Sequence, residues 1–217
     1  MRLVIENLRL KNLFPSAWVL VKENKRAYSV INIVYYGLVI IFMVVAAFNQ
    51  PLQDMLLDAV GAAFMTGPLA VVGNAYINAE VLKAIGLTFL VNLVIGSFLY
   101  ITLPSLIIPF LGFLLGIYRA MLWGLLFYPG HPDIGMIMIP HSITLILEGQ
   151  AYILALFGVY LQGRAFLWPK SVGLETHRQG YVEGLKHTGK IYRLVILTLA
   201  VAAIYEVVEV VLLAQFV

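Results

Sequence analysis

The sequence contains no cysteine among its 217 residues, and only 12% of those residues are charged. Without cysteine the chain has no disulfide, no thiolate nucleophile and no zinc or iron–sulfur site held by cysteine. Soluble domains carry about 25% charged residues, so this chain has roughly half the charge that a water-facing surface needs. These two shortages exclude a soluble globular enzyme and a domain stapled by disulfides.

Apolar residues are abundant instead: they make up 62% of the chain, and the mean hydropathy is +0.94. The formal net charge of +3 comes from lysines and arginines that flank the apolar runs, which is where basic residues meet a membrane surface. We therefore expect an integral membrane protein whose basic flanks contact anionic lipid headgroups, with no nucleic-acid partner.

Five segments have the roughly 20 mostly apolar residues that a membrane-spanning helix needs. The first begins too late and runs too long to be a cleaved signal peptide, so we expect it to remain as an anchor. The sequence predicts an all-α polytopic bundle of five transmembrane helices, over residues 27–48, 84–103, 107–128, 134–160 and 191–217. Pro104 and the Pro129-Gly130-His131-Pro132 turn separate the middle three.

The distribution of lysine and arginine predicts the orientation. Residues 1–26 contain six of these basic residues and the loop 161–190 contains five, whereas residues 49–83 contain only Lys83. Because cytoplasmic loops are enriched in Lys and Arg, both basic segments are expected on the cytoplasmic side. With five spans the C-terminus then lies outside, in a multi-pass protein of the cell membrane.

Two cytoplasmic segments have the composition of helices bound to the membrane surface. In Met1–Phe14 the apolar residues fall mostly on one helical face, and Ser16 is suited to be the N-cap of a second short helix. We therefore divide the chain into cytoplasmic interfacial helices (1–26) and a single membrane domain (27–217). Within the cytoplasmic loop, Gly173–Lys190 is expected to form a polar helix.

The segment Met55–Ala79 is apolar, but it also contains Asp58, several glycines and two asparagines. A sixth span here would place the second basic loop outside the cell. We therefore favour an outer interfacial helix or a re-entrant hairpin over a full span, and all three remain open.

Ionisable side chains inside a bilayer are costly and are candidates for functional sites. Placing each along its own helix groups Arg119, Glu148, Asn92 and Glu206 near the midplane, with His141 and Glu209 nearer the outer leaflet. Arginine keeps its charge, so Arg119 needs a carboxylate or a water-filled cavity, and Glu148 is the better-placed partner. The predicted intramembrane polar cluster consists of Asn92, Arg119, His141, Glu148, Glu206 and Glu209.

Three further residues are expected to shape the helices. Pro140 is predicted to kink the fourth span, because proline removes a backbone hydrogen bond. Gly112 and Gly116, spaced four apart on the third span, predict a seam of close helix packing.

The polar cluster has three interpretations. It is a clamp that fixes helix packing, or a path for a proton, ion or solute, or, least favoured, the site of an intramembrane hydrolase. The chain has neither a paired Ser and Lys nor a His-rich helix, so we expect no enzyme and assign no catalytic residue. We also expect no cofactor and no metal site, since a Glu pair with one His is a weak metal signal.

Part of the sequence resembles a known family. The stretches FLVNLVIGSFLY, IIPFLGFLLGIYRAMLWG and IPHSITLILEGQAYILALFGVYLQG, together with AAIYEVVE in the last helix, resemble the stage II sporulation protein M family of integral membrane proteins. The resemblance covers roughly residues 89–166 and the last helix. Ser142 stands where the family usually has glycine, and Leu145 stands where the family glutamate would fall.

The resemblance implies a five-span membrane protein with the N-terminus inside. The spore-former member of that family is a membrane anchor for a complex that degrades peptidoglycan during engulfment, while many relatives occur in organisms that do not sporulate. Asn92, Pro140 and His141 match the family motif, and Glu148 is the nearest counterpart of the family glutamate, seven residues after His141 where the family has about four. The motif carries no established chemistry.

Together these features favour a non-catalytic scaffold or assembly subunit of a membrane complex. The alternative is a permease-like subunit that conducts protons, ions or a small solute through the midplane cluster, with or without a separate ATPase. Five spans leave little room for a pore within a single chain. A homodimer or a membrane-protein partner is therefore expected for the scaffold and for the permease alike.

Overall fold

The structure is a computed structural model that describes residues 13–213 of the chain, and the side chains of residues 16–211. Within that range all the regular secondary structure is helical. In chain order the elements are α2 Leu13–Glu23, α3 Lys25–Phe48, α4 Gln50–Met65, α5 Ala70–Ile77, α6 Val81–Leu90, the π-helical segment η1 Val91–Thr102, α7 Leu103–Ile107, α8 Leu111–Leu126, α9 Met138–Leu167, the 3₁₀ turn η2 Pro169–Val172 and α10 His177–Leu213. The helix predicted over Met1–Phe14 and the last residues of the fifth span lie almost wholly outside the described residues.

Four helices are long and apolar enough to cross a membrane: Lys25–Phe48, Val81–Ile107, Met138–Leu167 and His177–Val211. The expected helical membrane bundle is confirmed at this level. The remaining predicted span, 107–128, is the shorter apolar helix α8, which has 16 residues. It is shortened at its start because Ile108 is extended and Phe110 takes a left-handed conformation (φ 68°), which turns the chain sharply between α7 and α8.

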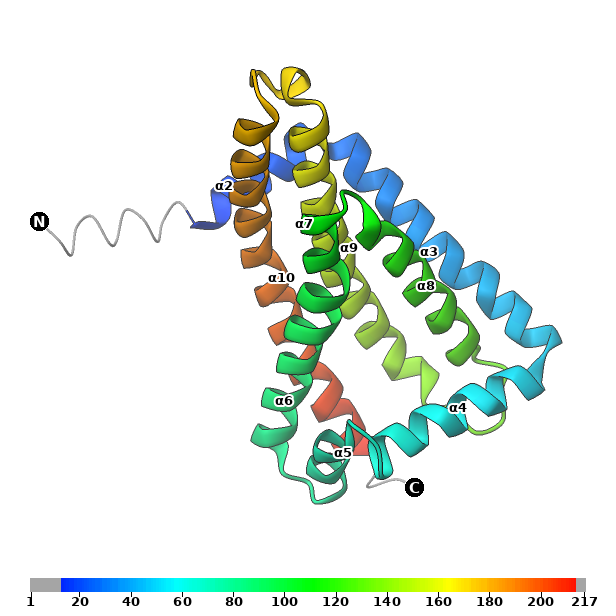
Figure 1. The fold of residues 1–217 in the computed structure, drawn as a ribbon. Helices are drawn as coiled ribbons and strands as arrows, with labels where there is room; N and C mark the ends of the chain where they lie inside the picture. Colours follow the sequence, from blue (N-terminus) through cyan, green and yellow to red (C-terminus); the bar gives the residue numbers. More distant parts are fainter. Residues whose placement is uncertain (1–12, 214–217) are drawn as a thin grey trace, which may run out of the picture.

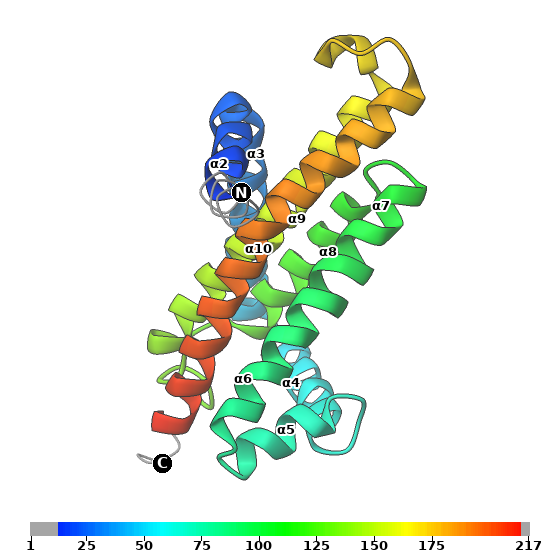
Figure 2. The same cartoon turned by 90° about the vertical axis from the view of Figure 1, so that its left-hand side faces the viewer.

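The helices form a bundle built on a long antiparallel hairpin of α9 and α10. In Figure 1 the turn between these two helices lies at the same end of the bundle as the start of α3, and α4 and α5 lie across the other end. Figure 2 shows α6 and α7 running along one side of that hairpin. We call the end that holds the α9–α10 turn (residues 168–176) and the α2–α3 junction the basic end, because Lys22, Arg164 and Lys170 lie there.

The α9–α10 hairpin extends well beyond the predicted spans. The predicted loop 161–190 shrinks to residues 168–176, and the polar helix expected over Gly173–Lys190 begins at His177 and continues into the fifth span. Two glycines allow this extension, because a Cβ on Gly180 would lie 1.9 Å from the Ala165 carbonyl oxygen and one on Gly184 2.8 Å from the Gln162 Cα. Helices α9 and α10 therefore extend as far as they pack against each other, beyond the ends of their apolar segments.

Three local expectations are wrong. α9 begins at Met138, so Pro140 lies in its first turn, where a missing N–H is tolerated, and it does not kink the helix interior. α2 begins at Leu13, three residues before Ser16, so Ser16 is not its N-cap. The second span does not stop before Pro104, which lies at the start of α7 in a helix that continues to Ile107.

The segment Met55–Ala79 fits an interfacial helix, a re-entrant hairpin or a span by its sequence. In the structure it forms most of α4 and all of α5, which meet at an angle of 82°. Both helices lie at the end of the bundle opposite the basic end (Figure 1). α3 finishes and α6 begins at this same end, so α4 and α5 connect two helix ends on one side of the bundle.

Glycines let α8 approach its neighbours closely. A Cβ on Gly112 would lie 2.3 Å from the Ile101 carbonyl oxygen, and one on Gly116 would lie 2.8 Å from Leu156. The structure therefore uses both glycines for packing within the chain, against η1 and α9.

Candidate functional site

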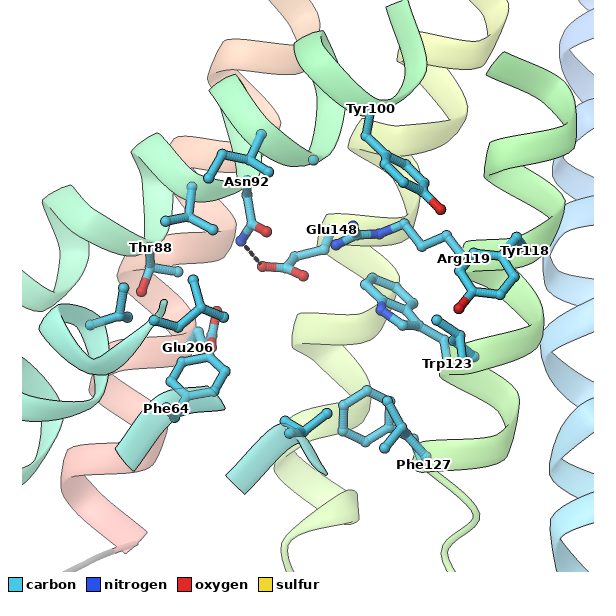
Figure 3. A pocket seen from close by; sticks show the side chains of 18 residues that line it. Phe64, Thr88, Asn92, Tyr100, Tyr118, Arg119, Trp123, Phe127, Glu148 and Glu206 are labelled. Atoms are coloured by element: carbon cyan, nitrogen blue, oxygen red, sulfur yellow. Dashed lines mark hydrogen bonds between the residues drawn. The ribbon is translucent and has the colours of Figure 1, made fainter. Parts of the chain in front are cut away.

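A cavity of about 500 Å³ lies between α4, α5, α6, η1, α8, α9 and α10. Most of its wall is apolar, with Phe64 and Phe127 among the side chains that line it (Figure 3). Four of the six predicted site residues also line it: Asn92, Arg119, Glu148 and Glu206. The structure thus brings the predicted midplane group together around one space.

The π-helical segment η1 carries one side of this cavity. Its i→i+5 hydrogen bonds widen the turn, and such segments occur frequently at functional sites. Asn92, Gly96 and Tyr100 of η1 all line the cavity, and the Asn92 carbonyl accepts a hydrogen bond from the Ser97 hydroxyl at 3.0 Å. The wider turn therefore presents Asn92 to α9.

A chain of hydrogen bonds links the glutamate to the arginine. The Asn92 amide donates to Glu148 Oε1, and the Tyr152 hydroxyl donates to Asn92 Oδ1 at 2.6 Å. Arg119 Nη2 donates in turn to the Tyr152 hydroxyl at 2.5 Å. The guanidinium carbon lies 3.8 Å from the centre of the Tyr152 ring and 5.3 Å from that of Trp123, within cation–π range.

The predicted direct contact between Arg119 and Glu148 is wrong. Among the side chains that the structure describes, these two residues form no ion pair within 4.0 Å. Tyr152 lies one turn after Glu148 on α9, and its ring and hydroxyl occupy the position next to the guanidinium. Arg119 Nε remains buried without a hydrogen-bond partner in the described part of the chain.

Glu206 adds a second acid beside Glu148. The two side chains, from α10 and α9, line the same cavity. Glu148 is buried, with 7% of its surface exposed, and Glu206 is half-buried. Two carboxylates in one largely apolar cavity repel each other, so ionisation of one disfavours ionisation of the other.

His141 and Glu209 form a separate pair that does not line the cavity. Glu209 Oε1 lies 3.2 Å from His141 Nδ1, and Oε2 accepts a hydrogen bond from the Thr144 hydroxyl at 2.9 Å. Both carboxylate oxygens of the buried Glu209 therefore have partners. This pair joins α9 to α10 one turn away from Glu206, on the side of α4 and α5.

Sequence reasoning missed the residues that hold α4 across the end of the cavity. Gln53 is fully buried, and its amide donates to the carbonyl oxygens of Leu126 at 2.9 Å and Tyr128 at 3.3 Å. The nearly buried His131 lies 2.8 Å from Asp54, the next residue of α4. The sequence signals this contact only weakly. Gln53 and Asp54 form a polar pair at the start of an apolar segment, and His131 lies in a turn rich in proline and glycine.

No group of three or more His, Asp or Glu side chains that could hold a metal ion occurs in the described part of the chain. Comparison of the chain with protein-family models, curated proteins and solved structures finds no match. The resemblance to the stage II sporulation protein M family therefore remains a prediction.

Proposed function

We propose that the chain is a permease-like membrane subunit that takes up a proton, an ion or a small polar solute in the cavity described above. The observation that carries this proposal is that Arg119, Asn92, Glu148 and Glu206 all face one space of about 500 Å³. That volume is within the range of small-ligand sites, and ionisable groups at membrane depth mark proton and ion pathways.

The acid pair supplies the chemistry for uptake. With one proton on the Glu148–Glu206 pair, the remaining carboxylate balances the charge of Arg119. A cation that enters the cavity favours loss of this proton, because the second carboxylate then gains an opposite charge nearby. The pair is thus suited to exchange a proton for a cation.

The proposed topology has five crossings, formed by α3, α6 to α7, α8, α9 and α10. In this topology the basic end faces the cytoplasm, and α4 and α5 stay at the outer face of the membrane. The support is that α4 and α5 connect helix ends on one side of the bundle, and that lysine and arginine concentrate at the other end. The outer face would then be closed by α4 and α5, which supply Val60, Phe64 and Val72 to the cavity wall.

Proton flux into liposomes tests the proposal. The purified chain is reconstituted with an internal pH-sensitive dye, and an outward gradient of sodium or potassium drives proton uptake by exchange. We expect wild-type flux above that of protein-free liposomes, and loss of this flux in Glu206→Gln, which keeps the shape but removes the exchangeable proton. Glu183→Gln is the matched control, because Glu183 pairs with Lys186 away from the cavity and its loss should leave the flux intact.

A non-catalytic scaffold is the second candidate function. It is favoured by the buried Glu209, whose two oxygens are both bonded in a way that fixes α9 against α10. Flux equal to that of protein-free liposomes, in wild type and Glu206→Gln alike and with potassium or sodium as the permeant ion, would overturn the permease proposal. A scaffold would in that case still retain its membrane partners in the Glu206→Gln variant.

A further inference from the structure

A second site lies at the basic end of the bundle, far from the polar cavity along the helices. Here a groove of about 620 Å³ lies between the α2–α3 junction and the last turns of α9. Three cationic side chains line it, Lys25, Arg26 and Arg164, and Glu23 is the one acid among its lining residues. The groove therefore has an excess of positive charge at one end of the apolar helices, which is where lipid headgroups are expected.

Arg164 is held in place within this groove. Its Nη1 donates to Asn24 Oδ1 at 3.1 Å, its Nε donates to the Ser171 hydroxyl at 3.3 Å and its Nη2 donates to the Ser171 carbonyl at 3.3 Å. A guanidinium has five N–H donors, so one donor on each terminal nitrogen has no partner among residues 13–213. A planar group held in this way, with free donors, is suited to a phosphate.

An apolar slot of about 210 Å³ continues from the groove between α3 and α8. The two spaces share Val30, Ile31 and Phe113 in their walls, so they lie next to each other. From Val30 the slot follows α3 to Leu38, which corresponds to about 12 Å along the helix axis. Its lining is apolar along that length, apart from the hydroxyl of Tyr35.

We infer that this groove and slot form a binding site for an anionic glycerophospholipid from the leaflet at the basic end. The phosphate would lie among Lys25, Arg26 and Arg164, and one acyl chain would enter the slot beside Val34. A free anion would use only the groove, and an uncharged lipid only the slot. Because the cationic groove and the apolar slot lie next to each other, they favour a ligand that has both parts. This inference does not depend on the proposed permease function.

Native mass spectrometry of the full-length chain in detergent tests this site. The probes are dioleoyl phosphatidylglycerol, dioleoyl phosphatidylcholine and inorganic phosphate. We expect phosphatidylglycerol to bind in preference to phosphatidylcholine, and inorganic phosphate not to displace it. Equal binding of the two lipids would overturn the inference, and so would displacement of the lipid by phosphate, which would show an anion site alone.

Matched variants separate the site from general attraction between basic residues and anionic lipids. The double variant Lys25→Gln with Arg26→Gln removes two cations from the groove. We expect it to weaken phosphatidylglycerol binding about 30-fold, which is the usual combined contribution of two basic residues to binding at an anionic surface. Lys22→Gln with Lys170→Gln removes the same charge from exposed side chains at the same end that do not line the groove, and should leave binding unchanged. An equal loss in both double variants would contradict a defined site.

The slot has its own pair of variants. Val34→Trp fills the slot and should lower phosphatidylglycerol binding, whereas Ile33→Trp, at the neighbouring residue, leaves the slot open and should not. Ile33 is 72% exposed and Val34 47% exposed, so both changes add bulk at accessible positions. Unchanged binding in Val34→Trp, with wild-type thermal stability, would show that no acyl chain occupies the slot.

Discussion

At the scale of single residues, Tyr152 connects Arg119 to Asn92 in the chain of hydrogen bonds that ends at Glu148. Its hydroxyl accepts from Arg119 and donates to Asn92, and its ring faces the guanidinium. The sequence marks Arg119 and Asn92 as unusual in an apolar span, but tyrosine is common at such positions. The acids and the arginine were thus predictable, while the group that connects them was not.

Replacing this tyrosine should destabilise the protein. Tyr152→Phe leaves a buried arginine donor and an asparagine oxygen without their partner, which costs about 1–3 kcal/mol. We expect a lower midpoint of thermal unfolding in detergent. Tyr160→Phe is the control on the same helix, because within the described residues the Tyr160 hydroxyl has no hydrogen-bond partner. Equal destabilisation by both changes would contradict the role given to Tyr152.

Gly96 provides a second test of this geometry. A Cβ at Gly96 would lie 3.1 Å from the Tyr152 ring and hydroxyl and 3.5 Å from Arg119 Nη1, so Gly96→Ala should push Tyr152 away and lower the unfolding midpoint. At Gly86, on the same span, nothing lies within 4 Å of an added Cβ. Gly86→Ala should leave stability unchanged or raise it by up to about 1 kcal/mol, because alanine favours helix. If Gly96→Ala were the more stable of the two variants, the close contact would be refuted.

At the scale of helices and turns, α4 and α5 show what a hydropathy pattern leaves open. The pattern of residues 55–79 favours an interfacial helix or a re-entrant hairpin over a span, but it does not decide among them, since it records composition and not position. The position depends on Gln53 and His131, whose side chains fix α4 to the end of α8 and to the turn that follows. Contacts between residues more than 70 positions apart leave no periodic signal in either segment.

Loss of the Gln53 amide should release α4. Gln53→Leu leaves the carbonyl groups of Leu126 and Tyr128 without these donors, so we expect faster hydrogen–deuterium exchange across Gln50–Met65. Gln50→Leu is the control at an exposed position of the same helix and should not change the exchange rates. Unchanged exchange in Gln53→Leu would mean that other contacts hold α4.

At the scale of the whole molecule, the sequence predicts the helical bundle and most of its helices but misplaces their ends. The sequence predicts the last span over residues 191–217. In the structure α10 begins earlier, at His177, because Gly180 and Gly184 let it pack against α9. Hydropathy indicates where lipid contacts a helix and gives no information on how far the helix continues. The turn at Phe110 shortens α8 for the same reason, since its left-handed backbone follows from local packing of the chain.

The proposed topology predicts opposite labelling of two single cysteines. The natural chain has none, so Glu175→Cys in the α9–α10 turn and Asp58→Cys on α4 each introduce one exposed thiol. We expect a membrane-impermeant maleimide to reach Asp58→Cys from outside the cell and Glu175→Cys only after the membrane is opened. Labelling of both from the same side would contradict the five-crossing arrangement.

If water enters the cavity among Arg119, Glu148 and Glu206 at membrane depth, two adjacent positions on η1 differ in their access to it, and a cysteine at each position tests this. Ile95 lines the cavity, whereas Val94 does not, and both are partly exposed, at 51% and 43%. Methanethiosulfonate reagents react with the thiolate, which requires water. We predict that a charged reagent modifies Ile95→Cys in intact membranes and leaves Val94→Cys unmodified. If neither cysteine reacts, or if both react at the same rate, there is no water-accessible cavity at this position.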